Sequence, residues 1–400
     1  MKIAIISNLY PPYGRGGAEI VITRIVTELL AEGHEVFVMT SRPFKGLRSL
    51  WPRLEDVANE MIYRFYPLNL YHPLRDFKHP KIIRLLSHII DMMNPLNGLF
   101  VRKWIHDVAP DVIWTHNLKG IGLTIPFFLR TLQIPVVHHV HDVQLAIPSG
   151  LMLAGLERPY FPKRFLQRVY ALVCILLIGS PAVVISPSQF LKNFYTHRGF
   201  FKKSQVMVLP NPAPKIETLP RNTRPLGPLR LLVAGQLEDH KGIRFLIESL
   251  KAFDVPFELT LAGDGSLRTF VSALRLEDRR FTYVGFLALD QLLKAFQVAD
   301  ALIVPSLCYE NSPTIIYEAL EAGLPVVASD IGGVAELVHQ GTNGFLFTPG
   351  NRDELFSVLR TLNTEKDRLR VNAPAIRATV ADLAIERYVE KLVALFASLT

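Results

Sequence analysis

The sequence predicts an α/β protein built from two doubly wound domains, each around a parallel sheet. Three observations carry this prediction. A chain of 400 residues exceeds what one core of this kind holds comfortably, two series of short apolar strands alternate with helical patterns, and a proline-rich stretch separates the two series. With 49% hydrophobic and 20% charged residues, the composition is that of a folded globular protein.

The first series of elements reads as continuous apolar runs between helices, which is typical of a parallel sheet covered on both faces. A helix is expected over residues 18–31, and Gly33 suits the position after its C-terminus. Residues 42–80 are basic, aromatic and irregular, and no element is predicted there. We expect strands at residues 2–7, 35–40, 111–115, 135–140, 182–185 and 206–209.

Residues 210–228 hold six prolines and show no hydrophobic periodicity, so they are predicted to be a linker. The predicted domains are therefore residues 1–209 and 229–384, with an amphipathic helix at residues 385–400 packing across their junction. Ligands of open α/β sheets bind at the carboxyl ends of the strands, so we expect a site in a cleft between the domains. The second series of strands is expected at residues 229–234, 258–262, 282–284, 301–304, 326–328 and 345–347.

The bulk features constrain where the protein works. Two cysteines, Cys174 and Cys308, lie in apolar surroundings and indicate buried thiols in a reducing compartment. The N-terminus lacks the pattern of a signal peptide, and no apolar run is long enough to span a bilayer. The longest run, Val169 to Gly179, is expected to be either a buried core helix or a surface that dips into the bilayer interface.

The net charge of +8 is concentrated in the first half of the chain. Residues 1–210 hold 24 Lys and Arg against 13 Asp and Glu, whereas residues 211–400 hold 20 against 23. A one-sided basic surface attracts phosphate-rich partners, namely nucleic acid, anionic lipid or a pyrophosphate-linked substrate, although an ordinary solvated charge excess gives the same count. Mixed basic and apolar stretches such as residues 164–173 favour an anionic membrane surface.

The strongest chemical pattern is C-Y-E-N-S-P-T-I-I-Y-E at residues 308–318, which follows a predicted buried strand. If Pro313 opens a helix, the backbone N–H groups around Ser312 to Ile315 form an anion site. Glu310 and Glu318 would repel a phosphate unless they contact neutral groups such as sugar hydroxyls. The pattern therefore suits a nucleotide-sugar, although Glu310 in a surface loop and Glu318 on a solvated helix face remain the alternative.

Weaker patterns follow other strands. In V-A-G-Q-L-E-D-H-K-G, residues 233–242, Gly235 allows close backbone approach and Lys241 can place a charge on a phosphate. Asp264, within A-G-D-G, is expected to cap the next helix, and Gly332 and Gly333 to form a strand-to-helix turn.

In the first half, G-R-G-G at residues 14–17 could cradle a diphosphate, but Glu19 stands where a dinucleotide fingerprint needs glycine. His116, His138, His139 and His141 end two neighbouring strands; without cysteine or a carboxylate framework, zinc is the weaker interpretation. His141, beside Asp142, is the histidine we expect at the cleft.

Together these segments resemble glycosyltransferase family 4, whose GT-B fold has two facing Rossmann-like domains. The resemblance covers most of the chain. Its most diagnostic part is the pair Glu310 and Glu318 within YENSPTIIYEA at residues 309–319, followed by EAGLPVVASDIGGVAELV at residues 321–338. Other matching segments are GRGGAE, HHVHD, ISPSQF, LPNP, GQLEDHKG, LAGDGSL and GTNGFLFTPGN at residues 14–19, 138–142, 185–190, 209–212, 235–242, 261–267 and 341–351.

The resemblance implies roles for individual residues. Glu310 would contact donor-sugar hydroxyls, Glu318 the ribose, and Lys241 the diphosphate, while His141 would line the reaction centre. The donor-binding set it implies is completed by Gly16, Gly17, Gly235, Gln236, Gly285, Phe286, Asn311, Ser312, Pro313, Thr314 and Ile315.

The implied activity is sugar transfer from a nucleotide-sugar, such as a UDP- or GDP-sugar, with retained anomeric configuration. The expected acceptor is a lipid-linked saccharide, used by a cytoplasmic protein peripheral on the inner face of the plasma membrane. No D-x-D motif occurs in the chain, so neither a metal nor another cofactor is expected, and no nucleic acid partner is expected.

One departure from the family pattern is Gln236, where arginine is usual. An amide donates hydrogen bonds without charge, so phosphate binding should be weaker or supported by another base. Two alternatives stay open: a non-catalytic membrane-attached relative, which Gln236 favours, and a nicotinamide-dependent oxidoreductase, which the broken glycine fingerprint disfavours.

Overall fold

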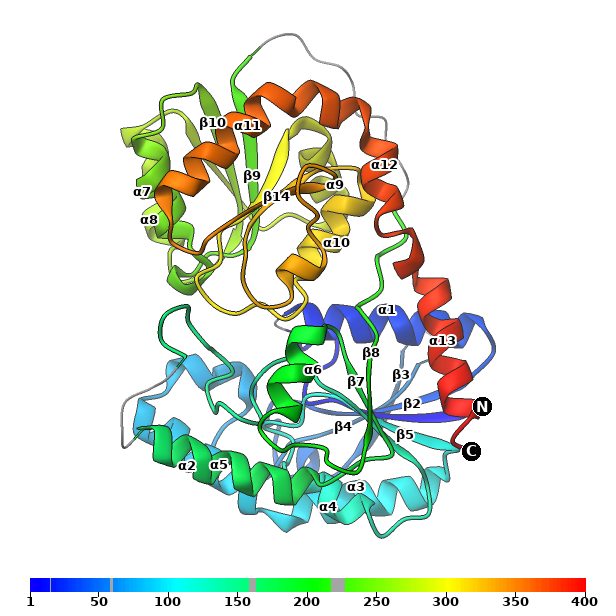
Figure 1. Ribbon diagram of the computed structural model, residues 1–400. Helices are drawn as coiled ribbons and strands as arrows, with labels where there is room; N and C mark the ends of the chain where they lie inside the picture. Colours follow the sequence, from blue (N-terminus) through cyan, green and yellow to red (C-terminus); the bar gives the residue numbers. More distant parts are fainter. Residues whose placement is uncertain (15, 58–59, 158–162, 217–226) are drawn as a thin grey trace. The chain divides into compact units, whose positions relative to one another are not determined.

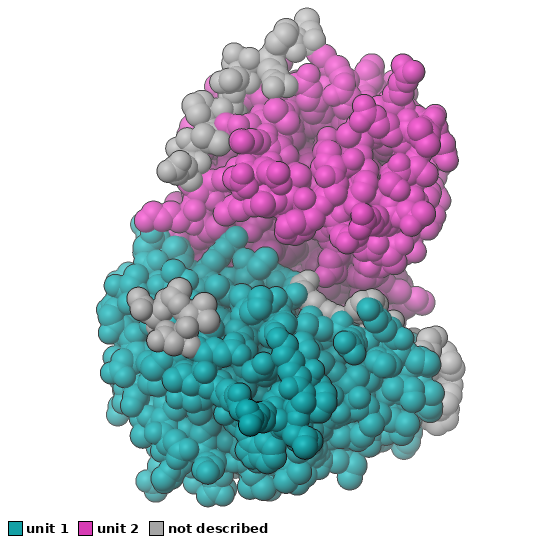
Figure 2. Space-filling view, turned by 180° about the vertical axis from the view of Figure 1, so that it is seen from behind, with its two compact units in different colours: residues 1–150, 159–210, 385–400 teal, residues 151–158, 211–384 magenta. Residues whose placement is uncertain are grey.

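The computed structural model describes residues 1–14, 16–57, 60–157, 163–216 and 227–400. By its internal contacts the chain divides into two α/β units, coloured separately in Figure 2. Residues 1–150, 159–210 and 385–400 form the first unit, and residues 151–158 and 211–384 form the second. Arg15 of the glycine motif and residues 217–226 of the expected linker lie outside the described residues.

The first unit is built around an eight-stranded sheet with the order β3-β4-β2-β1-β5-β6-β7-β8 among the described residues. All neighbouring strands are parallel except β3 and β4. Helices α1 and α13 lie on one side of this sheet and α2 to α5 on the other (Figure 1). The strands are β1 (Lys2–Ile6), β2 (Glu35–Ser41), β3 (Arg53–Val57), β4 (Glu60–Phe65), β5 (Val112–Thr115), β6 (Val136–His139), β7 (Val183–Ser186) and β8 (Gln205–Val208). The helices are α1 (Gly17–Ala31), α2 (Lys81–Met93), α3 (Pro95–Val108), α4 (Ile125–Leu129), α5 (Lys163–Ile178), α6 (Gln189–Thr196) and α13 (Ile385–Ala397), with 3₁₀ turns η1 (Leu47–Leu50) and η2 (Pro73–Lys78).

The second unit holds a parallel sheet of six described strands in the order β11-β10-β9-β12-β13-β14. Its strands are β9 (Leu229–Gln236), β10 (Phe257–Asp264), β11 (Phe281–Gly285), β12 (Ala301–Val304), β13 (Val326–Ser329) and β14 (Gly344–Phe347). Its helices are α7 (Ile243–Lys251), α8 (Arg268–Glu277), α9 (Leu289–Val298), α10 (Thr314–Glu321), α11 (Arg352–Val371) and α12 (Ala373–Ala378), with 3₁₀ turns η3 (Asp239–Lys241), η4 (Val334–Glu336) and η5 (Ala381–Leu383). Two parallel-sheet α/β units confirm the predicted fold class.

Burial explains why the predicted apolar runs became strands. The central strands β1, β5, β7, β12 and β13 are buried almost throughout, as expected for strands covered on both faces. On α1, the apolar residues recur at helical spacing and pack against the sheet together with α13, whose buried face includes Tyr388, Leu392 and Phe396. Helix α13 therefore packs with the first unit.

Two local expectations need correction, and residues 42–80, for which the sequence predicted no element, contain the strands β3 and β4. This antiparallel pair extends the sheet beyond β2. Polar residues interrupt both strands, so they lack the continuous apolar runs that predicted the other strands. Residues 151–157, placed in the first domain by sequence, pack with the second unit. Asp264 does not cap α8, because that helix begins only at Arg268 and the Asp264 carboxylate accepts a hydrogen bond from the Gly265 N–H.

Candidate functional site

The order of the second sheet reverses between β9 and β12, and the main candidate site lies in the loops that follow these two neighbouring strands. The Leu307 N–H donates to the His240 carbonyl at 3.0 Å, which joins the two loops. Gly242 packs directly on the second loop: it has a φ of +73°, and a Cβ there would lie 1.8 Å from the Pro305 carbonyl oxygen. Only glycine fits, so the loop after β9 is held against the loop after β12.

This packing brings Lys241 and Glu310 together, although 69 residues separate them in sequence. The Lys241 ammonium lies 2.6 Å from a carboxylate oxygen of Glu310, which also accepts a hydrogen bond from the Ser306 hydroxyl at 2.7 Å. Burial disfavours the ammonium, but the attraction of Glu310 outweighs it and raises the pKa of Lys241 above its ordinary value. Lys241 is thus a fixed positive charge, and Glu310 is a half-buried acceptor rather than a free surface carboxylate.

The loop that carries Glu310 is supported from two directions that the sequence did not reveal. On one side, the Gly333 N–H donates to the Glu310 carbonyl at 2.7 Å, and a Cβ at Gly332 would lie 2.2 Å from that same oxygen. The sequence predicted only a turn at Gly332 and Gly333. The structure shows that this glycine pair also lets the backbone after β13 approach the Glu310 loop closely.

On the other side, residues 151–157 pair with the same loop. The Ala154 N–H donates to the Leu307 carbonyl at 2.9 Å, and the Tyr309 N–H donates to the Met152 carbonyl at 2.8 Å. The Tyr309 hydroxyl also donates to the Glu157 carboxylate at 3.0 Å. These contacts hold the Cys308–Tyr309 backbone extended, and no sequence signal pointed to them because the paired segments are about 150 residues apart.

Helix α10 begins at Thr314, one residue later than expected, with Pro313 as its N-cap. The preceding turn is fixed by a 2.6 Å hydrogen bond between the Ser312 and Tyr317 hydroxyls and by the Asn211 side-chain amide, which donates to the Ser312 carbonyl at 3.3 Å. Asn311, Ser312, Pro313, Thr314 and Ile315 are all half-buried, so the helix N-terminus is partly open. The N–H groups at a helix N-terminus are suited to an anion.

Glu318 lies in the second turn of α10 and is only 7% exposed. Its burial excludes the alternative that Glu318 lies on a solvated helix face. A carboxylate one helical turn from an anion site can also accept hydrogen bonds from the hydroxyl groups of a ligand.

The remaining predicted donor-binding residues of this unit lie at the same carboxyl edge. Gly235 and Gln236 end β9 and are exposed, and Gly285 ends β11. Phe286 follows Gly285 and is 80% exposed, which is unusual for a large aromatic residue in a folded domain. An exposed aromatic face at a sheet edge is suited to stacking on a planar ring.

In the first unit, the glycine turn after β1 has a different chemistry from the expected cradle. Gly16 is the N-cap of α1, and its N–H donates to the Glu19 carboxylate at 2.8 Å. The acidic residue that breaks the dinucleotide fingerprint therefore satisfies a backbone donor next to Gly17. Fewer N–H groups remain here for a phosphate than the sequence implied.

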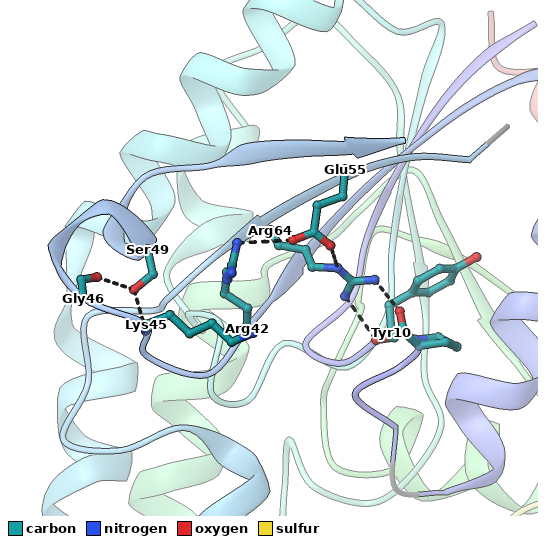
Figure 3. A network of polar contacts seen from close by, with 8 residues as sticks. Tyr10, Arg42, Lys45, Gly46, Ser49, Glu55 and Arg64 are labelled. Carbon is teal, nitrogen blue, oxygen red and sulfur yellow. Dashed lines mark hydrogen bonds and ion pairs between the residues drawn. The ribbon is translucent and has the colours of Figure 1, made fainter. Parts of the chain in front are cut away.

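The loop before this turn is fixed by Arg64, a buried cation on β4 that sequence analysis missed (Figure 3). Its guanidinium donates to the Glu55 carboxylate at 2.8 Å and to the Tyr10 carbonyl at 3.2 Å, and it also donates to the Pro11 carbonyl. Glu55 additionally pairs with Arg42 at 3.2 Å. The glycine turn therefore starts from a rigid base.

His141 lies in a stacked cluster of neutral histidines at the carboxyl ends of β5 and β6. His141 Nε2 and His116 Nδ1 are 2.9 Å apart, and the rings of His139 and His141 stack at 4.3 Å. Burial, followed by the charge of His138, lowers the pKa of His141 to about 3. His138 instead contacts the Thr115 hydroxyl at 2.8 Å.

The nitrogens of His116, His139 and His141 lie within 4.8 Å of one another and could in principle hold a metal ion. The rings, however, are nearly parallel, at 20° for His139 and His141 and 23° for His116 and His141. A tetrahedral metal needs ring planes that converge on one point. The arrangement therefore fits a stack of buried rings, in which His116 and His141 share a hydrogen bond, better than a metal centre.

A small cavity opens beside this cluster. Burial raises the pKa of Asp142 to about 6, and it lowers the pKa of Lys119 although Asp76, Asp142 and Asp91 act against the shift. The Lys119 ammonium donates to the Pro148 carbonyl at 3.1 Å. Polar groups that line the cavity include His116, Asn117, Lys119, His141, Asp142 and Gln144. Such a lining can bind hydroxyl groups.

Gly16, Gly17 and His141 lie in the first unit, whereas the other predicted site residues lie in the second. Comparison with known families identifies both units. The model described as "Glycosyltransferase Family 4" matches residues 15–214, and that described as "Glycosyl transferases group 1" matches residues 228–365. The chain belongs to glycosyltransferase family 4. This membership replaces the alternative of a nicotinamide-dependent oxidoreductase and identifies the two α/β units as a GT-B fold.

Individual relatives agree with this assignment. The chain is 25% identical over 373 residues to an uncharacterised glycosyltransferase of Methanocaldococcus jannaschii, covering 89% of this chain and 87% of that one. It is also 25% identical to the putative teichuronic acid biosynthesis glycosyltransferase TuaC of Bacillus subtilis, covering 84% and 83%. Among solved structures, Anabaena HepE in complex with UDP matches all of both chains at 20% identity with a TM-score of 0.68.

Proposed function

We propose that this family 4 glycosyltransferase moves a sugar from a UDP- or GDP-sugar to a lipid-linked saccharide during synthesis of a cell-envelope or exported polysaccharide. One observation carries the proposal: the 2.6 Å pair of Lys241 and Glu310 at the switch point of the second sheet, next to the N-terminus of α10. The teichuronic acid relative and the UDP complex of HepE support the polysaccharide and the donor class.

The pair matches the chemistry of a sugar joined to a diphosphate. Lys241 and the N–H groups at the start of α10 stabilise negative charge, while Glu310 and Glu318 accept hydrogen bonds from hydroxyls on either side. A cation and a carboxylate in contact can bind a phosphate and a neighbouring hydroxyl of one small molecule. A phosphate alone would be repelled by the two glutamates.

We propose transfer with retained configuration. The bond between the anomeric carbon and the leaving phosphate oxygen breaks, and the acceptor oxygen bonds to that carbon on the same face. The acceptor proton passes to the leaving phosphate oxygen. Charge grows on the diphosphate as the bond breaks, so Lys241 acts mainly by electrostatic stabilisation, and Glu310 by positioning the sugar.

Neither a metal nor another cofactor is part of this proposal, because the Lys241 ammonium and the α10 backbone can neutralise the leaving group and the chain lacks a D-x-D motif. We place the protein in the cytoplasm, peripheral on the inner face of the plasma membrane. The two buried free thiols suit a reducing compartment, and the basic first half suits an anionic lipid surface. No helix among the described residues is long and apolar enough to cross a bilayer.

The decisive experiment is a panel of nucleotide-sugars, screened by thermal stabilisation and by release of the nucleoside diphosphate. A ligand at about 100 times its Kd stabilises the folded state by roughly 2.7 kcal/mol, which is readily measured. We expect one UDP- or GDP-sugar to stabilise the protein and to be hydrolysed slowly. Stabilisation without turnover of any donor, with or without saccharide acceptor, would instead support the non-catalytic relative that exposed Gln236 favours.

A further inference from the structure

Helix α2 exposes its apolar stripe, whereas an amphipathic helix of a water-soluble protein normally buries it. The exposed apolar residues of α2 recur at positions 82, 85, 86, 89 and 93, which form a single stripe at helical spacing. This stripe faces outward: Ile82 is 61% exposed, Leu85 54% and Met93 74%. An outward apolar stripe costs free energy in water, so it points to a partner that covers it.

On the inward face of the same helix, Asp91 and Ser87 form hydrogen bonds that fix this orientation. Asp91 is 1% exposed and accepts a hydrogen bond from the Gly120 N–H at 2.8 Å. The Ser87 hydroxyl donates to the Asn69 side chain at 2.8 Å, and the Asn69 amide donates back to the Ser87 carbonyl at 3.0 Å. Rotating α2 to bury its apolar stripe would break these bonds.

Helix α5 adds a second apolar stripe beside the first. Phe165, Leu166, Val169, Leu172 and Leu176 are between 43% and 71% exposed, while Tyr170, Cys174 and Ile178 face inward. This helix contains the longest apolar run of the sequence, and the exposed stripe shows that it is not a buried core helix.

The two helices run on the same side of the first sheet (Figure 1), and the rings of His88 on α2 and Tyr170 on α5 lie 5.2 Å apart. The stripes therefore belong to one surface, which we call the α2/α5 face: Ile82, Leu85, Leu86, Ile89, Met93, Phe165, Leu166, Val169, Leu172 and Leu176. At the end of α5, the Arg130 guanidinium donates to the carbonyls of Leu176 and Leu177. Backbone groups that would otherwise need water are thus already satisfied there.

The charges around the α2/α5 face identify the occupant. Arg84 on α2 and Lys163, Arg164 and Arg168 on α5 are exposed. The two helices contain one acidic residue, Asp91, and it is buried. Arg84 pairs with Asp76 at 3.1 Å, so the basic rim consists mainly of Lys163, Arg164 and Arg168 on α5. Exposed apolar stripes with such a rim match the acyl boundary and the anionic headgroups of a lipid bilayer.

We propose that the α2/α5 face is the membrane-docking surface of this protein, with the two apolar stripes inserted into the interface of an anionic bilayer. The proposal deepens the membrane attachment proposed above by assigning it to two helices and a set of side chains. It is independent of catalysis, because it is measured as binding alone.

The position of α2 also bears on the acceptor. The loop that lines the cavity beside His141 is hydrogen-bonded to this helix and to its C-cap. The Leu123 N–H donates to the Asp91 carbonyl at 3.2 Å, and the Thr124 hydroxyl donates to the Asn94 carbonyl at 2.7 Å. Helix α2 and its C-cap residue therefore support the loop that lines the cavity. This placement favours an acceptor whose lipid part stays in the bilayer.

The test is co-flotation of the full chain with phosphatidylglycerol–phosphatidylcholine vesicles at low salt. The variants are Leu85→Ser with Ile89→Ser on α2, and Leu172→Ser with Leu176→Ser on α5. The matched control is Leu276→Ser with Val371→Ser, two residues of the second unit that are 92% and 69% exposed. Circular dichroism melting checks that each variant folds, which is expected because every substituted side chain is exposed.

We expect wild-type and control proteins to co-float equally, and each stripe variant to bind at least about tenfold more weakly. Neutralising Arg164 and Arg168 should weaken binding about fivefold per residue on anionic vesicles. Failure of the wild type to co-float would overturn both membrane proposals. Stripe variants that bind vesicles like the wild type would overturn the α2/α5 assignment alone. The same conclusion would follow if the lipid-free protein formed a stable dimer that the stripe substitutions dissociate.

Discussion

Lys241→Ala is the perturbation that tests the proposed chemistry most directly. In the structure the Lys241 ammonium contacts Glu310 at 2.6 Å and is held by the packing of Gly242 on Pro305. If this ammonium stabilises the leaving diphosphate, its removal should act on the transition state more than on the bound donor. Turnover should therefore fall more than donor affinity.

The expected magnitude follows from the site. Loss of one preorganised charged donor at a developing anion costs about 100- to 1000-fold in kcat, or roughly 3–4 kcal/mol. The folded state should lose less. The side chains of Lys241 and Glu310 are 27% and 13% exposed, so stranding the carboxylate costs about 1–3 kcal/mol, below the cost of a fully buried pair. The melting temperature should fall by only a few degrees.

The assay is initial-rate turnover of a saturating donor, with Lys241→Arg and Glu310→Gln measured in parallel. Arginine keeps the charge and should retain more activity than alanine. In Glu310→Gln the lysine remains, so the loss should appear mainly in positioning of the sugar. Wild-type turnover by a folded Lys241→Ala protein would refute the phosphate role. Equal losses of turnover in all three variants would mean that Lys241 and Glu310 only support the structure of the site.

Three further outcomes are expected. Gln236→Arg should tighten nucleoside diphosphate binding about tenfold, because an added guanidinium at the exposed end of β9 supplies a second charge; unchanged affinity by calorimetry would mean that the diphosphate lies elsewhere. Chelators such as EDTA should leave turnover unchanged, and restoration of a lost activity by added metal would contradict the proposed metal independence. Acidification from pH 7 to 5.5 should lower the melting temperature of the first unit. Burial lowers the pKa of His138 and of His88 to about 4, so these rings stay neutral when folded, whereas the unfolded chain takes up protons near pH 6.5. Stability is thus lost as the pH falls through 6.5, by about 1.4 kcal/mol per such histidine at pH 5.5. The raised pKa values of Asp91 and Asp142, about 7 and 6, act in the opposite direction but involve fewer groups than the lowered ones of His88, His116, His138, His139 and His141. An equal or higher melting temperature at pH 5.5, by scanning calorimetry, would contradict this balance.

The sequence by itself determined the features that depend on local pattern. Apolar runs such as Ala301–Val304 predicted the buried strands, because a strand covered on both faces must be apolar at every position. The glutamate pair and the motif around Lys241 predicted the family and the residue types of the site. Helix boundaries were correct to about one residue at Pro313 and Thr314.

Only the tertiary structure decided which distant residues meet and which faces stay open. Lys241 contacts Glu310 because β9 and β12 are neighbours in the sheet, and strand order is not written in either strand. The buried state of Glu318 and the packing of Gly332 against the Glu310 loop follow from the same long-range arrangement. Most telling is α2: its sequence gives a clear apolar stripe, and periodicity alone would bury it. The structure turns the stripe outward because Asp91 and Ser87 form hydrogen bonds inward, and only three-dimensional contacts make that choice.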